Sequence, residues 1–220
     1  MGFSRVLTEM TGSKTDKIEI ITLRDLHFAQ SFVLATEVFV HGSSLHKALG
    51  VTLLEYCDYL RPSFAAMVDE GLSTVAVDSS GEVMGCLIWA DFFNHRYSSQ
   101  KTPDKFKPLV ALTEALTAKY TRSFARGEVM LADMAAVAQT AAGQGLYQRM
   151  RLAAEAHARM RGFRFILSEL SSVRTQHVLL NKMGHKAVAE IAFAQFEHEG
   201  KRPFAAIDSP PSLILSECML

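Results

Sequence analysis

Hydrophobic and polar positions recur along the chain with two different periods. A short β-branched run over 17–23 predicts a first strand. Apolar residues then return every three to four positions, which predicts one helix over 25–40 and a second over 52–69. The Gly- and Ser-containing segment 41–50 between them is expected to be a loop. The chain therefore begins with a strand followed by two helices.

The middle of the chain predicts a hairpin and then an inserted helix. Two apolar runs, 73–77 and 82–92, are separated by turn-forming residues, which predicts two antiparallel strands. Helical spacing returns over 105–124, and a mostly apolar strand follows over 128–137. A hairpin, a helix and a buried strand are expected in that order.

The last part of the chain alternates helices and strands. A Gly-containing loop leads into a long amphipathic helix that ends at Gly162. The pattern then predicts a strand, a helix and two more strands, over 163–170, 172–183, 187–197 and 202–208. This order predicts an α/β (α+β) protein with a mixed sheet.

The predicted elements divide the chain into three parts. A polar segment, 1–16, is expected to be a flexible leader, and 17–208 is expected to form one folded domain. Pro210 and Pro211 follow the last predicted strand, so 209–220 is expected to be a C-terminal tail that packs on this chain or on another.

Composition narrows the class of function. Hydrophobic residues make up 49% of the chain and charged residues 21%, which suffices for a substantial core. The 23 basic and 23 acidic residues leave no net charge to attract nucleic acid or anionic lipid. No stretch approaches the roughly 18 consecutive apolar residues of a membrane span. We expect a cytoplasmic protein without a nucleic-acid or membrane partner, and a homodimer remains open.

The cysteines point to no metal and no disulfide framework. Cys57, Cys86 and Cys218 are odd in number and widely spaced, and they form no C-x-x-C pair. A reducing compartment fits this pattern, and the sequence suggests no metal ligands.

The loop at 140–145 carries the clearest chemical signal. A strand that enters a helix through glycines presents unpaired backbone N–H groups and the positive end of a helix dipole, which attract a pyrophosphate. The small residues Ala141, Ala142, Gly143 and Gly145 let a phosphate approach the backbone. The alternative is that the two glycines only make the turn into the helix.

The order of the elements resembles that of the GNAT superfamily of N-acetyltransferases over about 17–208. The acyl-CoA loop of that family runs Gln or Arg, two residues, Gly, one residue, then Gly or Ala, and 140–145 reads Thr-Ala-Ala-Gly-Gln-Gly. A helix that ends near a Leu-Gly-Phe-like triplet is a second marker, and 179–185 is similar to it. The helix after Lys105, Phe106 and Lys107 is most similar to an insertion of the arylalkylamine N-acetyltransferase-like group.

This resemblance implies a fold and an activity. The fold is a mixed, mostly antiparallel twisted sheet of about six or seven strands flanked by helices. The activity is transfer of an acyl group from acetyl-CoA, or another acyl-CoA, to a small-molecule amine by direct attack in a ternary complex, without a metal. The residues implied in binding the co-substrate are Ala135, Ala136, Val137, Thr140, Ala141, Ala142, Gly143, Gln144, Gly145, Leu146 and Gln176.

Four side chains are candidates for catalysis. Asp133 shares its strand phase with Val129 and Leu131 and is the leading candidate for the base, against a buried Asp that only holds a loop. His41, at the end of the first helix, is a candidate because imidazole side chains can transfer protons near neutral pH, against a surface histidine. Glu37 lies one turn earlier, and Ser172 either takes part in the site or caps its helix.

Three departures from the family pattern favour a second interpretation. Thr140 stands where the family has Gln or Arg, Leu180 stands where many relatives have a Tyr as general acid, and 42–43 replaces an acidic residue and Pro. The alternative is a catalytically degenerate domain that binds acyl-CoA as a sensor or scaffold.

Overall fold

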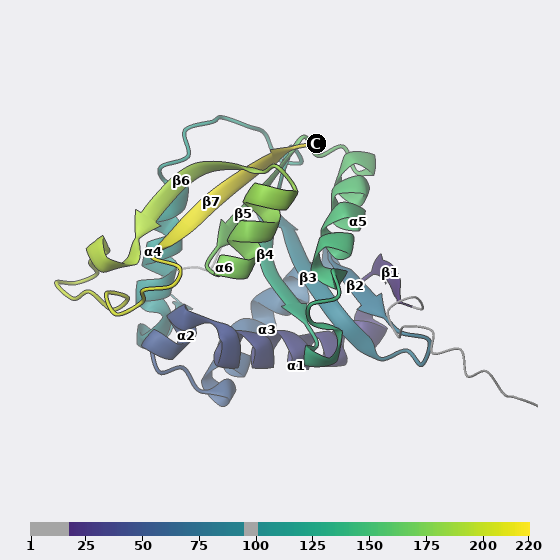
Figure 1. Ribbon diagram of the computed structural model, residues 1–220, viewed down its shortest axis with the longest axis horizontal. Coiled ribbons are helices and arrows are strands. Elements are labelled where there is room, and N and C mark those ends of the chain that lie inside the picture. The colour runs from purple at the N-terminus through teal and green to yellow at the C-terminus, as the bar shows by residue number, and fades with distance from the viewer. Residues whose placement is uncertain (1–17, 95–100) are drawn as a thin grey trace, which may run out of the picture.

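A mixed sheet of seven strands forms the centre of the computed structural model, which describes residues 18–94 and 101–220 (Figure 1). The strand order is β1-β2-β3-β4-β5-β7-β6, and β4 and β5 form the parallel pair among otherwise antiparallel neighbours. The strands are β1 (Glu19–Thr22), β2 (Thr74–Val77), β3 (Val83–Asp91), β4 (Val129–Val137), β5 (Phe165–Leu170), β6 (Lys186–Ala192) and β7 (Ser212–Met219). The predicted mixed sheet is confirmed.

Helices cover both faces of this sheet. They are α1 (Asp25–Gly42), α2 (Ser44–Ala48), α3 (Leu53–Asp69), α4 (Lys107–Thr117), α5 (Leu146–Met160) and α6 (Val173–Gln176), and the chain continues from α6 into a π-helical turn, η5 (His177–Lys182). Short 3₁₀ turns are η3 (Asp104–Phe106), η4 (Gln139–Ala141) and η6 (Phe193–Gln195). None of the helices in the described part of the chain is long and apolar enough to cross a membrane.

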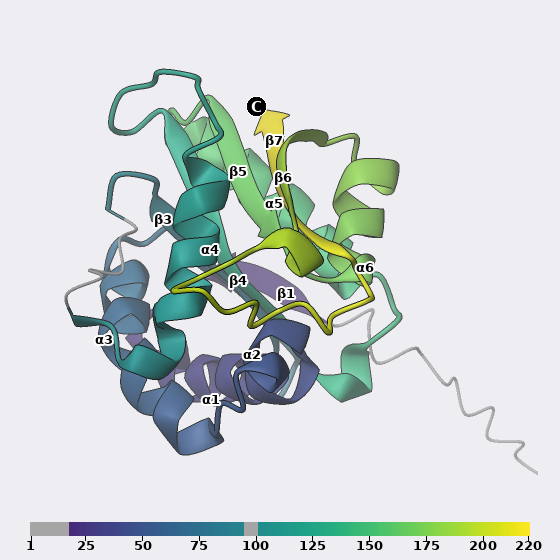
Figure 2. The same ribbon diagram turned by 90° about the vertical axis from the view of Figure 1, so that its left-hand side faces the viewer.

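The alternation of buried side chains assigns each helix to a face. Val75 and Ile88 pack in a core cluster with α1 and α3, whereas their neighbours Leu87 and Trp89 pack in a second cluster with α5. A third cluster joins α4 to β5 and β7 through Leu131 and other apolar residues, on the face opposite α5. Figure 2 shows α1 to α4 on the near side of the sheet.

Most of the predicted elements are confirmed within a few residues, as local signals led us to expect. The helix α3, for example, begins where Thr52 accepts a hydrogen bond from the backbone of Glu55 while Glu55 accepts one from the backbone of Thr52. The expected leader at 1–16 lies outside the described residues.

The C-terminal part of the chain corrects two predictions. Segment 202–208 forms turns rather than a strand, and 212–219, expected as a tail beyond the domain, is β7. This strand lies between β5 and β6 and pairs with both, so that Leu215 is opposite Glu169 on one side and Ala189 on the other. The sequence analysis placed the end of the domain at Pro210 and Pro211. The pairing that makes 212–219 an internal strand involves β5 and β6, and no local pattern around the prolines indicates it.

Two helix predictions are also corrected. The helix expected over 105–124 ends at Thr117, because the chain then turns so that Phe124 packs edge-on against Phe92 at 5.1 Å between ring centroids. The loop expected over 41–50 contains the short helix α2, which Ser43 caps by accepting a hydrogen bond from the backbone N–H of His46.

Candidate active site

The strands β4 and β5 diverge in the middle of the sheet. Their parallel pairing runs from Val129 opposite Phe165 to Ala132 opposite Ser168 and then stops, although both strands continue. On its other edge β4 pairs with β3, where Trp89 lies opposite Ala132 and Ile88 opposite Met134. Asp133 is therefore the extra residue of a β-bulge, which bends the strand and re-aims its side chain.

A cavity of about 590 Å³ opens at this divergence. It receives side chains from both faces of the sheet, so it passes between the layers rather than lying on one surface. Its polar and aromatic lining includes Ser43, His46, Tyr56, Tyr59, Asp133, Tyr147, Arg151, Ser168, Glu169, Ser172 and Arg174. This volume is in the range of small-molecule sites.

Asp133 lies half-buried on the cavity wall and faces two phenols of α3. Burial raises the pKa of Tyr56 and of Tyr59, and the negative charge of Asp133 raises both further. The carboxylate therefore lies within electrostatic reach of two hydroxyl groups that keep their protons at neutral pH. The predicted location of Asp133 in a site is consistent with this geometry.

His46 was not predicted from the sequence and lies on the same cavity. Its Nδ1 is 2.9 Å from the Ser43 hydroxyl, and its ring meets the Tyr56 ring at 4.5 Å between centroids. Its Nε2 is buried and has no hydrogen-bond partner among the described residues. Burial lowers the pKa of His46 to about 4, so the ring is neutral at pH 7. The capping serine three residues earlier was the signal that could have identified this short helix.

The structure places His41 and Glu37 away from the cavity. Val38, Phe39 and Gly42 of α1 line it, whereas Glu37 and His41 are exposed and are not part of its lining. Glu37 and His41 lie four positions apart and so share a helix face that points to solvent. The structure does not bring these two predicted residues together with Asp133.

Ser172 lines the cavity and also caps α6. Its hydroxyl accepts a hydrogen bond from the Thr175 backbone N–H at 3.1 Å, and the two hydroxyl groups are 2.9 Å apart. Gln176 is also a predicted site residue, and its amide nitrogen donates to the carbonyl oxygens of Leu170 and Ser212 at 3.1 Å each. It ties β5 to β7 and is not part of the cavity lining.

The Gly-containing loop lies between β4 and α5, as predicted. Gly143 and Gly145 have φ angles of 77° and 75°, a conformation that side-chain-bearing residues rarely adopt, and no atom lies within 4 Å of a Cβ built at either position. Thr140, Gln144 and both glycines are exposed, while Ala141 and Leu146 are buried beneath the loop. The first N–H groups of α5 have no partners within the helix, so the loop suits an anionic phosphate.

The three predicted positions on β4 differ in their surroundings. Ala135 lines the cavity, Ala136 is buried in the core cluster under α1 and α3, and Val137 packs toward α5. Since β5 no longer pairs with β4 beyond Ala132, this edge of β4 offers backbone groups to a ligand.

A buried arginine lies on the α5 side of the cavity. Arg151 is 1% exposed, its Nη2 donates to the Ser168 hydroxyl at 3.1 Å, and its guanidinium lies 4.6 Å from the Trp89 ring centroid. Tyr147 lies one turn earlier on α5 and lines the same cavity. Burial raises the pKa of Tyr147, so this phenol also keeps its proton at neutral pH.

The seven-stranded sheet and the divergence of β4 from β5 define the class: the chain has the GNAT N-acetyltransferase fold. The C-terminal condensation domain of Ebony in complex with β-alanyl-dopamine superposes with a TM-score of 0.81 at 19% identity, covering 93% of this chain and 99% of that one. Arylalkylamine N-acetyltransferase 2 from Aedes aegypti gives 0.75 at 17% identity, covering 92% and 98%. The Drosophila melanogaster polyamine N-acetyltransferase gives 0.74 at 14% identity, covering 92% and 100%.

These likenesses confirm the fold that the sequence resemblance implied. No model of a protein family matches the sequence, and no curated protein matches it. The fold is therefore shared over almost the whole chain, while the identities are too low to carry the activity over by themselves.

Proposed function

We propose that this protein transfers an acyl group from a CoA thioester to the primary amine of a small molecule. The observation that carries the proposal is a cavity that joins Asp133 and His46 to the divergent edge of β4 and reaches Tyr147, in the first turn of α5. Several similar structures are N-acetyltransferases that act on amines, which supports the same class of reaction here.

The residues present fit a CoA thioester. The exposed loop 140–145 and the first turn of α5 would hold the pyrophosphate, and Arg174 at the start of α6 adds a positive charge on the cavity wall. The edge of β4 beyond its pairing with β5, from Met134 to Val137, would hold the pantetheine and thioester end through backbone hydrogen bonds.

The chemistry needs a neutral amine, a proton acceptor and donors for the oxyanion. Asp133 attracts the amine and accepts its proton, and the unpartnered Nε2 of His46 accepts a hydrogen bond that orients the nitrogen. Backbone N–H groups on the β4 edge stabilise the tetrahedral oxyanion. The amine first forms the C–N bond at the thioester carbonyl; the tetrahedral oxyanion then collapses, the C–S bond breaks, and the departing sulfur takes up a proton so that CoA leaves as the thiol.

The departing sulfur needs a proton, and the residue that supplies it here differs from the Tyr that many relatives of the family use. Leu180 occupies the usual position of the Tyr and does not line the cavity. Tyr147 does line it and keeps its proton at neutral pH, so we assign it the role of acid.

The test is a thiol-release assay with acetyl-CoA against arylalkylamines, polyamines and amino acids. We expect Asp133→Asn to lower kcat by about 100-fold or more, because general base catalysis contributes that much in other enzymes. His46→Gln should lower kcat by about tenfold or more, because it removes the hydrogen-bond acceptor that orients the amine. The matched control is His41→Gln, on the exposed face of α1, which should keep wild-type turnover within about twofold.

Each outcome separates the interpretations. Amine-dependent thiol release that survives Asp133→Asn would reject Asp133 as the base. Stoichiometric CoA binding in a calorimeter without turnover for any amine would support the sensor or scaffold alternative, and no binding at all would reject the loop assignment.

A second candidate function is condensation of an aminoacyl thioester with an arylalkylamine. The observation that favours it is the superposition on the Ebony condensation domain, whose bound product is an amide of β-alanine and dopamine. The same assay distinguishes it, since β-alanyl-CoA with dopamine would then release thiol faster than acetyl-CoA does.

A further inference from the structure

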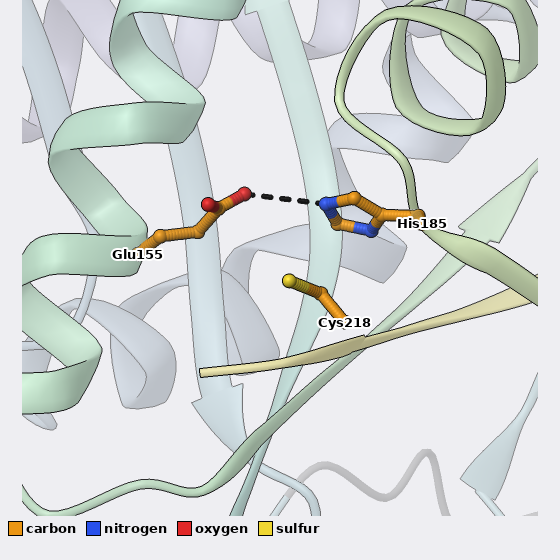
Figure 3. A group of neighbouring side chains, drawn as sticks. All are labelled: Glu155, His185 and Cys218. Carbon is orange, nitrogen blue, oxygen red and sulfur yellow. Dashed lines mark hydrogen bonds and ion pairs between the residues drawn. The ribbon is translucent and has the colours of Figure 1, made fainter.

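Three potential metal ligands meet outside the cavity, from parts of the chain far apart in sequence. Glu155 lies on α5, His185 in the turn after η5, and Cys218 on β7 (Figure 3). None of the three is part of the cavity lining. The cluster is therefore separate from the proposed site of acyl transfer.

The geometry of the cluster is close to that of a metal site. One ligand atom from each residue lies within 4.8 Å of the other two, and His185 Nε2 is 3.2 Å from Glu155 Oε1. Bonds of 2.0–2.3 Å to a tetrahedral zinc place ligand atoms about 3.3–3.8 Å apart. The Glu–His pair already has this spacing, so the thiol needs to move by only about 1 Å.

The burial of these polar groups is also consistent with a bound ion or water between them. His185 is 5% and Glu155 6% exposed, so the imidazole and the carboxylate are both withdrawn from solvent. In Figure 3 the thiol of Cys218 points toward the space between the carboxylate and the imidazole. Polar side chains that converge in a buried place usually share a water or an ion.

The surrounding charges are compatible with a divalent cation. A cation that binds the sulfur would favour the thiolate, and thiolate plus carboxylate would neutralise its two positive charges. Arg151 is directed to Ser168 and Trp89, so its guanidinium has its own contacts.

We propose that Glu155, His185 and Cys218 form a zinc-type metal site with one position open for water. Carboxylate, imidazole and thiolate together suit a borderline-soft ion such as Zn²⁺ better than Mg²⁺ or Ca²⁺. The site links α5, the η5–β6 turn and β7, and so fastens the C-terminal strand to the helix that follows the CoA loop. This proposed site does not depend on acyl transfer.

The test uses the untagged, metal-free protein titrated with Co²⁺ and then with Zn²⁺. Wild type should bind one equivalent of Co²⁺ with a near-ultraviolet absorption band from thiolate coordination, which Zn²⁺ then displaces. Cys218→Ser should lose this band and bind Zn²⁺ at least about tenfold more weakly. Cys57→Ser is the matched control, since Cys57 is the other partly exposed cysteine and lies on α3.

A second measurement guards against a variant that fails to fold. Circular dichroism without metal should be the same for wild type, Cys218→Ser and Cys57→Ser, and Zn²⁺ should raise the Tm of wild type and Cys57→Ser but not of Cys218→Ser. A wild-type protein without the thiolate band, or a Cys218→Ser variant that keeps both the band and the rise in Tm, would overturn the proposal.

Discussion

At the scale of single residues, the candidate site depends on side chains whose surroundings differ from those of the adjacent residues in the sequence. His46 is 4% exposed, whereas Lys47, the next residue, is exposed. Asp133 lies in a bulge, so the consecutive side chains of Asp133 and Met134 lie on the same face of the sheet, the one away from α5. Such positions arise from packing and register rather than from the residue type.

Burial of His46 predicts how stability depends on pH. An unfolded His has a pKa near 6.5, and burial lowers the pKa of His46 in the folded protein to about 4. Between these values the unfolded chain binds a proton that the folded protein does not, so the free energy of unfolding falls as pH falls from 6.5 to 4. This group contributes on the order of 3 kcal/mol to that loss.

Urea unfolding of wild type and His46→Gln at pH 7 and at pH 4.5 measures this contribution. Other groups titrate in the same range, so the quantity of interest is the difference between the two proteins. We expect the variant to lose less stability than wild type on acidification. An equal loss would show that His46 is not buried in its neutral form.

At the scale of elements, α5 links the two proposed functional regions. Its first turn follows the predicted CoA loop, Tyr147 and Arg151 reach the cavity, and Glu155 belongs to the proposed metal site with His185 and Cys218. These side chains recur every four residues along one face, as a helix requires. Glycines with positive φ flank both ends of this helix, Gly145 at 75° and Gly162 at 87°.

Substitution of these two glycines separates backbone strain from ligand binding. Gly145→Ala and Gly162→Ala should each cost about 1 kcal/mol of stability, because both force Ala into the left-handed region. Gly145→Ala should also weaken CoA binding by about fivefold or more, since it lies among the N–H groups at the positive end of the helix. Isothermal titration with CoA checks this, and equal affinities for both variants would argue against phosphate binding at this loop.

At the scale of the whole molecule, β7 completes the sheet. It pairs with β5 on one edge and β6 on the other, although it comes last in the chain (Figure 1). Leu213 and Leu215 are at most 1% exposed and pack in the cluster with α4. The C-terminal strand is therefore part of the core and supports β5, which forms one wall of the cavity.

Truncation of one buried side chain on β7 tests whether this strand is part of the core. Leu215→Ala is expected to lower the free energy of unfolding by about 2–5 kcal/mol, the usual cost of removing a buried Leu side chain. Met219→Ala is the matched control on the same strand, since Met219 is 76% exposed, and it should change stability by less than about 0.5 kcal/mol. Chemical denaturation measures both, and a similar small loss for each would mean that β7 is not a core strand in solution.

Much of the fold, but less of the candidate site, could be predicted from the sequence. Local hydrophobic periods predicted α1, α3, α5 and the β2–β3 hairpin, and the glycines before α5 predicted the loop between it and β4. Of the predicted catalytic residues, Asp133 and Ser172 line the cavity, while His41 and Glu37 do not. Val38 and Gly42 line the cavity while their neighbours Glu37 and His41 are exposed, because a shift of one residue along a helix turns a side chain by 100°.

The sequence by itself determined most of the helices and strands before residue 200, because a period of 3.6 or 2 records which side of each segment is buried. Only the tertiary structure decided that β7 lies between β5 and β6, that Asp133 bulges from β4, and that His46 faces the cavity. It also decided that Glu155, His185 and Cys218 meet. The physical reason is that pairing, bulges and side-chain clusters depend on contacts between residues far apart in the chain, which no local pattern encodes.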